Sequence, residues 1–138
     1  MSDELVTPEN VSKEMLRSMF AAASLETSFD RDGDLVVSDG VFKGFVLLDD
    51  KNRSIKLMVV YDAEPSATKS DLLEFVNRIN YDYMIICAVF VPEHHTVCFD
   101  FYICLTGGVS QANIVYTTKC FLRIPLVAVK KHGSQFIK

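Results

Sequence analysis

Histidines are the side chains in this chain best suited to acid–base chemistry or metal binding near neutral pH. His94 and His95 stand together between two strand-like runs, and His132 lies near the end of the sequence. Adjacent residues in an extended turn point apart, so a single metal ion cannot readily reach both rings. We therefore expect His94 and His95 to be exposed turn residues.

The cysteines and one isolated carboxylate offer little more. Cys87, Cys98, Cys104 and Cys120 include no C-x-x-C pair that would indicate zinc or a thioredoxin-like centre. No histidine is placed beside any of them as a base, so a cysteine nucleophile is not supported. The pattern favours small buried thiols, although Cys87 and Cys98 could lie close enough for an incidental disulfide. Asp100 stands among apolar neighbours, where burial would raise its pKa, but a lone carboxylate is more typical of an edge or an interface.

Two further stretches resemble ligand-binding loops without matching them. The sequence DRDGD at residues 30–34 suggests a calcium loop, but Gly33 is misplaced and Val41 occupies the twelfth position, where a bidentate Glu is needed. Gly107 and Gly108 are followed by no Lys of a phosphate-binding loop, so helix capping explains them better. We therefore assign no catalytic, cofactor-binding or metal-binding residue, and expect a protein that is not an enzyme.

Composition limits the possible partners. The chain has 138 residues, 49% of them hydrophobic, yet no apolar run is long enough for a membrane span. Eighteen acidic and fourteen basic side chains give a net charge of −4, and no basic cluster marks a nucleic-acid surface. The N-terminus lacks the basic and apolar regions of a signal peptide, so we expect a cytoplasmic protein.

Patterning predicts the elements in the first half of the chain. Apolar residues at helical spacing, with Thr7 as N-cap, predict a helix over residues 8–24. Three strand-like runs follow, at residues 28–37, 42–48 and 54–61, separated by short turns that favour an antiparallel meander.

A second helix is expected from residue 68 or 70 to about residue 80, because Thr68 and Asp71 have the spacing of a capping box. The central hairpin spans residues 84–105. A last helix runs over residues 111–123 and stops or kinks near Pro125. After it we expect a bent extension or a docked tail, with the final residues frayed.

The central hairpin is predicted to have two apolar faces. If Val91 pairs with Thr96, every second residue from Met84 to Phe90 and from Val97 to Leu105 lies on one face of the hairpin. We expect this face to belong to the core. The opposite face is too apolar to be meant only for water, so we expect something to cover it. Its candidate protein-interaction or dimer residues are Ile85, Val89, Val91, Cys98 and Tyr102.

The element order is therefore α-β-β-β-α-β-β-α. It predicts an α+β fold in which helices pack on a five-stranded antiparallel sheet. The sequence has neither an internal repeat nor a long linker, so residues 1–138 are expected to form one domain, with its core over about residues 8–124.

Over residues 28–121 the sequence resembles the YbjN family of bacterial proteins, described as regulators of sensory transduction. The resemblance depends most on FVNRIN at residues 75–80 and LTGGVS at residues 105–110. It implies a fold similar to class I type III secretion chaperones, which are small acidic homodimers that hold an extended client segment. It implies no catalytic or ligand-binding residue. The chain departs from the family pattern at Pro125, which interrupts the expected last helix.

Two functions are open at this point. The first is a chaperone-like or regulatory adaptor, with a role in stress or sensory regulation, that forms a homodimer and binds a protein partner or client. The second is a small-molecule sensor with an apolar pocket between helices and sheet, lined by Met15, Met19, Phe75 and Phe101.

Overall fold

The structure is a computed structural model that describes residues 4–138. Within that range a single sheet of six strands has the order β1-β2-β3-β4-β6-β5, with every neighbouring pair antiparallel. The elements in chain order are α1 (Lys13–Ala22), β1 (Glu26–Phe29), β2 (Leu35–Ser38), β3 (Lys43–Leu48), β4 (Ser54–Asp62), α2 (Lys69–Asp82), β5 (Cys87–Val91), β6 (Thr96–Cys104), α3 (Gln111–His132) and the 3-10 helix η1 (Ser134–Phe136).

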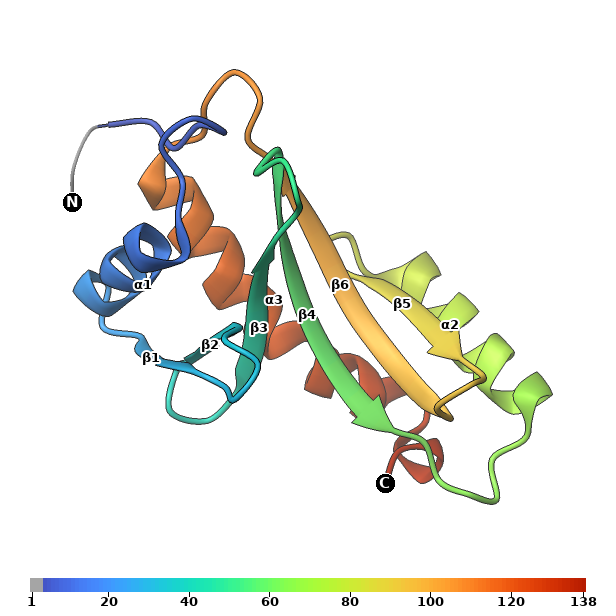
Figure 1. Cartoon of the computed structure of the whole chain (residues 1–138). Helices are drawn as coiled ribbons and strands as arrows, with labels where there is room; N and C mark the ends of the chain where they lie inside the picture. The colour runs from blue at the N-terminus through green and yellow to red at the C-terminus, as the bar shows by residue number, and fades with distance from the viewer. Residues whose placement is uncertain (1–3) are drawn as a thin grey trace.

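The helices pack on one side of the sheet (Figure 1). Helix α2 lies against β5, α3 crosses behind β4 and β6, and α1 packs on β1 and β2. Their apolar stripes meet one face of the strands, and burial of this surface provides the main stabilisation of the fold. The largest fully buried side chains include Leu16, Phe20, Leu35, Ile55, Leu57, Leu72, Phe75, Ile79, Phe99, Ile114 and Phe121.

The central hairpin has the predicted register. Val91 lies opposite Thr96, and the pairing continues to Cys87 opposite Asp100. Strand β6 is longer and pairs with β4 over the whole of β4, so β4 and β6 form the middle of the sheet. Met84 was expected in the core, but β5 begins only at Cys87, so Met84 precedes the strand and is exposed.

The prediction of five strands is wrong, because residues 28–37 form two strands and a turn. Strands β1 and β2 pair as a hairpin, with Phe29 opposite Leu35. The turn between them includes Gly33 at φ 83°, a left-handed conformation that glycine adopts without a steric penalty. The α+β class is confirmed, but four strands precede α2 in the chain instead of the three that were predicted.

Helix α1 begins later than predicted. Ser12 is the N-cap, and its side chain accepts a hydrogen bond from the Met15 N–H. Thr7 instead belongs to a preceding turn, in which its N–H donates to Asn10 Oδ1 and its hydroxyl and C=O accept from the Asn10 N–H. The start of α2 agrees with the sequence, since Thr68 and Asp71 form a reciprocal capping box.

Of the two outcomes predicted near Pro125, a stop or a kink, the stop is wrong, since α3 continues through the proline to His132. A proline within a helix removes one backbone hydrogen bond. Here that cost is offset because Pro125, Ala128 and Val129 are all buried, which fixes the second half of α3 against the core. The helix is long and apolar enough to span a membrane by composition, but its buried stripe belongs to this core.

The final residues are packed, not frayed. The Glu64 N–H donates to the Phe136 C=O at 2.7 Å, and the Lys138 N–H donates to the Asp62 C=O at 2.9 Å. The Phe136 ring also lies edge-on to Phe75, with centroids 5.9 Å apart. The C-terminal segment 136–138 is therefore paired with the end of β4.

Candidate binding surface

One face of the sheet is turned away from the helices, and we call it the open face (Figure 1). Side chains alternate along each strand, so the core and the open face take alternate residues. Within residues 4–138, no helix lies over the open face. It carries Val36, Phe45, Leu47, Lys56, Met58, Val60, Cys87, Val89, Val91, Cys98, Asp100 and Tyr102.

Four of the five predicted interaction residues lie on the open face. Val89 and Cys98 are direct cross-strand partners, Val91 lies two residues further along β5, and Tyr102 lies on β6. Val89 is 42% exposed and Tyr102 is 55% exposed. Ile85 does not join them, because it lies in the bend before β5 and is half-buried.

The sequence analysis missed the part of the open face on β3 and β4. Met58 lies opposite Phe45, and Val60, two residues along β4, is 40% exposed. The alternation in residues 54–61 contains the signal, but only the pairing of β4 with β6 shows which residues share a face with Val89. The apolar surface therefore extends from β5 across the sheet to β3.

The open face also carries one cation and one carboxylate near its centre. Lys56 is opposite Tyr102, and its Nζ lies 5.6 Å from the centroid of the Tyr102 ring, within the range of a cation–π contact. Desolvation raises the pKa of Asp100, and the charge of Lys56 acts in the opposite direction. The centre of the open face is therefore apolar with two opposite charges, and Lys43 and Asp62 lie on the same face nearer the ends of β3 and β4.

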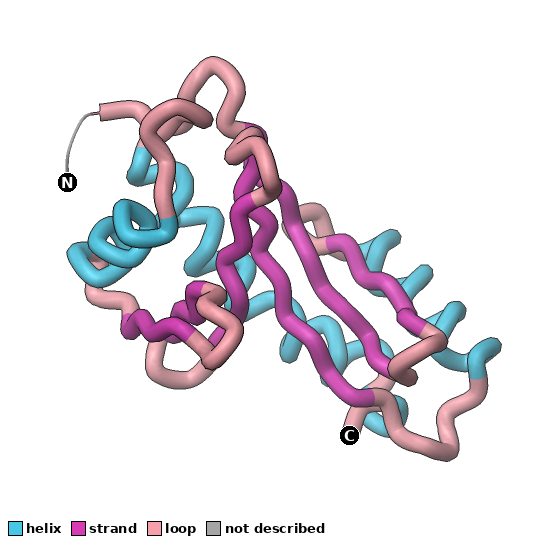
Figure 2. The backbone as a smooth tube through the Cα atoms, viewed as in Figure 1, coloured by secondary structure: helices cyan, strands magenta, loops and turns pink. Residues whose placement is uncertain are grey.

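A cavity of about 550 Å³ opens between β3 and β4. The two strands lie side by side near the β3–β4 turn and diverge toward the other end (Figure 2). Most of the lining side chains are apolar, and α3 contributes two of them. The lining residues are Asp30, Val36, Val41, Phe42, Lys43, Gly44, Phe45, Met58, Val59, Val60, Tyr61, Leu122 and Leu126.

This cavity is not the predicted sensor pocket. Met19 and Phe75, two of the four residues expected to line that pocket, are 5% and 1% exposed and belong to the hydrophobic core. None of the four predicted residues lines the cavity between β3 and β4.

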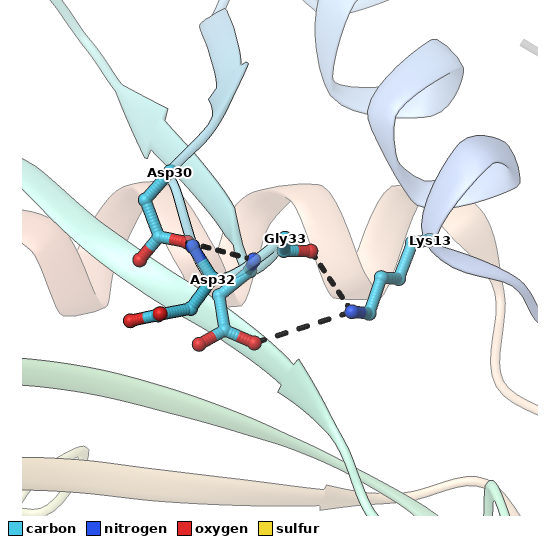
Figure 3. A network of polar contacts seen from close by, with 5 residues as sticks. Lys13, Asp30, Asp32 and Gly33 are labelled. Atoms are coloured by element: carbon cyan, nitrogen blue, oxygen red, sulfur yellow. Dashed lines mark hydrogen bonds and ion pairs between the residues drawn. The ribbon is translucent and has the colours of Figure 1, made fainter.

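The acidic turn at residues 30–34 is held by its own hydrogen bonds (Figure 3). Asp30 Oδ1 accepts from the N–H groups of Asp32 and Asp34, both at 2.9 Å. Lys13 Nζ donates to the Gly33 C=O at 2.9 Å and lies 4.0 Å from Asp34 Oδ1. These contacts give the turn a structural role in joining the β1–β2 hairpin to α1.

The histidines occupy three different environments. His94 is exposed at the hairpin tip, and His95 Nε2 lies 2.9 Å from the Glu64 C=O. His132 Nε2 lies 2.6 Å from Asp82 Oδ2, and Lys131 also contacts this carboxylate, which lowers the pKa of Asp82. Across residues 4–138, no group of three or more His, Cys, Asp or Glu side chains could hold a metal ion.

The fold and this surface define an α+β domain with helices on one side of a single sheet and an open, largely apolar face on the other. The model of the YbjN family, described as "Putative bacterial sensory transduction regulator", matches residues 12–125. The chain belongs to the YbjN family.

The structure is similar to a crystal structure of YbjN from E. coli, which is described as "a putative transcription regulator". The TM-score is 0.77 at 15% sequence identity, and the match covers 96% of this chain and 98% of that one. At this identity the likeness supports the fold alone. A search of curated proteins found no match.

Proposed function

We propose that this protein is a non-enzymatic regulatory module that binds protein through its open face, and that its first partner is a second copy of itself. The observation that carries the proposal is the exposure of Val60, Val89 and Tyr102 on one continuous sheet face. A contiguous apolar patch of this kind is typical of a protein-interaction site. The family description supports a regulatory role.

Self-association is favoured by the charges on the open face. A twofold axis places the same patch on both sides of a dimer interface, so the patch must complement itself. Lys56 and Asp100 provide one positive and one negative group on neighbouring strands. In a face-to-face dimer, Lys56 of one copy can therefore pair with Asp100 of the other, while Val89 and Tyr102 supply apolar contact.

The first experiment is light scattering on a size-exclusion column, under reducing conditions and over a roughly hundredfold range of concentration. We expect a dimer for the wild type and a monomer for Val89→Glu and Tyr102→Glu, because each places a charge in the apolar interface. Val127→Glu is the matched control, since Val127 is 55% exposed on α3, which packs on the opposite side of the sheet. A monomeric wild type, or a dimer unaffected by both substitutions, would contradict self-association through this face.

A charge exchange tests the pairing itself. Lys56→Asp and Asp100→Lys are each expected to weaken the dimer, because each places like charges opposite one another. The double variant restores opposite charges and should recover the dimer. If the double variant is as weak as the single variants, Lys56 and Asp100 do not pair between copies.

A further inference from the structure

The gap between β3 and β4 exposes part of a strand edge. The ladder between these strands ends where Phe45 lies opposite Met58. Strand β4 continues to Asp62 and remains paired with β6 on its other side. The last third of β4 therefore has β6 on one edge and no partner strand from β3 on the other.

Hydrogen bonds at the two ends of the β4–β6 ladder show which residues of β4 bond to β6. The Ala63 N–H donates to the His95 C=O, and the Leu105 N–H donates to the Arg53 C=O. In an antiparallel ladder such pairs recur at every second residue. Odd-numbered residues of β4 therefore bond to β6, and even-numbered residues direct their N–H and C=O groups to the other edge.

On that other edge, Met58 is paired with β3, and the Asp62 C=O accepts a hydrogen bond from the Lys138 N–H. Val60 lies between these two positions and belongs to neither pairing. Its N–H and C=O therefore point into the gap. Gly44 of β3 still lies against Met58 and Val59. At about 3.3 Å per residue, the space between Gly44 and Lys138 along β4 therefore accommodates roughly two residues of an extended chain.

The cavity lies directly at this edge. Val60 and Tyr61 form part of its wall, and Leu122 and Leu126 of α3 contribute from the helix side of the sheet. Its volume of about 550 Å³ exceeds that of any single amino-acid side chain. A chain that paired with Val60 could therefore place a large apolar side chain inside.

The rim of the cavity is fixed in place. Asp39 Oδ1 accepts hydrogen bonds from the N–H groups of Val41 and Phe42, at 3.0 and 2.8 Å. Asp39 Oδ2 also lies 3.6 Å from Arg123 Nε, which ties the turn between β2 and β3 to α3. The turn holds Val41 at the rim with 80% of its surface exposed.

We propose that this gap binds an extended peptide segment of a partner protein, whose main chain pairs with Val60 and whose large aliphatic or aromatic side chain enters the cavity. A strand edge backed by an apolar pocket is the recognition mode known as β-strand addition. The inference rests on and deepens the proposed protein-binding function: it adds the main-chain edge of β4 to the open face, with which it shares Val60.

The polar groups at the gap favour a peptide over a lipid. Val60 offers one donor and one acceptor with the spacing of a strand, which complements a main-chain amide. An acyl chain would leave both groups without partners. Asp30 and Lys43 carry opposite charges among the lining residues, so the cavity holds no net positive charge for a lipid carboxylate.

Hydrogen exchange tests the free edge directly. In the protein alone, the Val60 amide is expected to exchange rapidly, whereas the amides of Val59 and Tyr61, which face β6, exchange slowly. A fluorescein-labelled decapeptide with Lys at both ends and Thr alternating with Phe serves as the probe. Companion peptides carry Leu or Val in place of Phe. Bound peptide should protect the Val60 amide.

A proline substitution removes the donor that the proposal requires. Val60→Pro deletes this N–H, and Val60→Thr retains it with a side chain of similar size. Fluorescence anisotropy should show binding of at least one probe peptide to the wild type and to Val60→Thr. For Val60→Pro we expect a loss of affinity of about tenfold or more.

A second substitution fills the cavity. Leu126→Phe adds volume at the wall, whereas Val127→Phe places the same ring on the exposed side of α3. We expect Leu126→Phe to weaken binding and Val127→Phe to leave it unchanged. Circular dichroism and thermal unfolding establish that each variant is folded.

Three outcomes would overturn the inference: no binding of any probe to the wild type, equal binding to Val60→Pro, or a slowly exchanging Val60 amide in the free protein. Binding of oleate that is lost in Leu126→Phe and retained in Val60→Pro would instead indicate a lipid site. The dimer proposal is tested separately: Val89→Glu is expected to reduce the solution mass from dimer to monomer, and it does not alter the main chain at the edge of β4.

Discussion

Two strand edges of the sheet differ: the edge of β5 is covered by a side chain, and the edge of β4 at Val60 is open. At β5, the Asn80 side chain of α2 donates from Nδ2 to the Ala88 C=O at 3.0 Å, and its Oδ1 accepts from the Ala88 N–H at 2.6 Å. At β4, Val60 lies between two pairings and belongs to neither. An uncovered edge invites pairing with other chains, so a fold closes the edges where pairing would be harmful. At β4, the open edge lies beside the apolar cavity by which we propose that pairing becomes selective.

The largest loss of stability is expected from a proline substitution at the closed edge, on β5. Ala88→Pro removes the N–H that bonds to Asn80 and inserts a ring at a position that is 3% exposed. The loss of the hydrogen bond and the overpacking should together lower the free energy of unfolding by about 3 kcal/mol. Urea denaturation measures this change. Unchanged stability would mean that Asn80 does not close the edge.

Removing the Asn80 side chain, which bonds to the edge of β5, should lower the stability by less. Asn80→Ala leaves the N–H and C=O of Ala88 without their side-chain partner, which should cost about 1–3 kcal/mol. Asn77→Ala is the matched control, because Asn77 is exposed on the same helix. Equal loss of stability in the two variants would mean that helix propensity, not edge capping, explains the effect.

Asp39, which holds the rim of the cavity, should contribute less to the free energy of unfolding than Asn80, and its contribution should depend on pH. Hydrogen bonds from the N–H groups of Phe42 and Val41, together with Arg123, lower the pKa of Asp39, against an opposing effect of desolvation. A carboxylate with a lowered pKa stabilises the fold above its unfolded pKa, and this stabilisation is lost as the pH falls through the folded pKa.

Asp39→Ala is therefore expected to lower the free energy of unfolding by about 0.5–1 kcal/mol at pH 7, a modest value because the charged partner Arg123 is 71% exposed. The difference from the wild type should shrink below about pH 4. Urea denaturation at a series of pH values tests this. A difference that is constant with pH would assign the effect to packing instead of charge.

Proline at the open edge should have the smallest effect on stability. Val60→Pro removes an N–H that is not part of the ladder with β6, and edge strands tolerate proline at such positions. We expect a change within about 0.5 kcal/mol in the free energy of unfolding. A loss as large as that of Ala88→Pro would show that the Val60 amide has a partner within the fold.

The sequence predicted those features that depend on local chemistry. The pairing of Val91 with Thr96 followed from the turn and from alternation, and the capping box at Thr68 followed from residue spacing. The second apolar face of the hairpin was also identified from alternation. Within residues 4–138, no helix covers this face.

The errors arose where tertiary contacts outweigh local signals. Pro125 is tolerated within α3 because the residues beyond it pack in the core, and the sequence alone does not show that packing. The gap at Val60 depends on the point where β3 leaves β4 and on a C-terminal segment more than seventy residues later. In contrast, the hairpin of β1 and β2 could have been predicted, because DRDGD is typical of a turn.

The pairing of segment 136–138 with the end of β4 has a consequence for folding during synthesis. Translation at about 5–20 residues per second means that β4 leaves the ribosome several seconds before this segment does. Strand β6, which pairs with β4 along its whole length, is also made only after α2 and β5. Because β3 is made earlier but pairs with β4 only as far as Met58, the nascent chain exposes both edges of the last part of β4 during this interval. At that stage a chaperone that binds extended chains would protect it most.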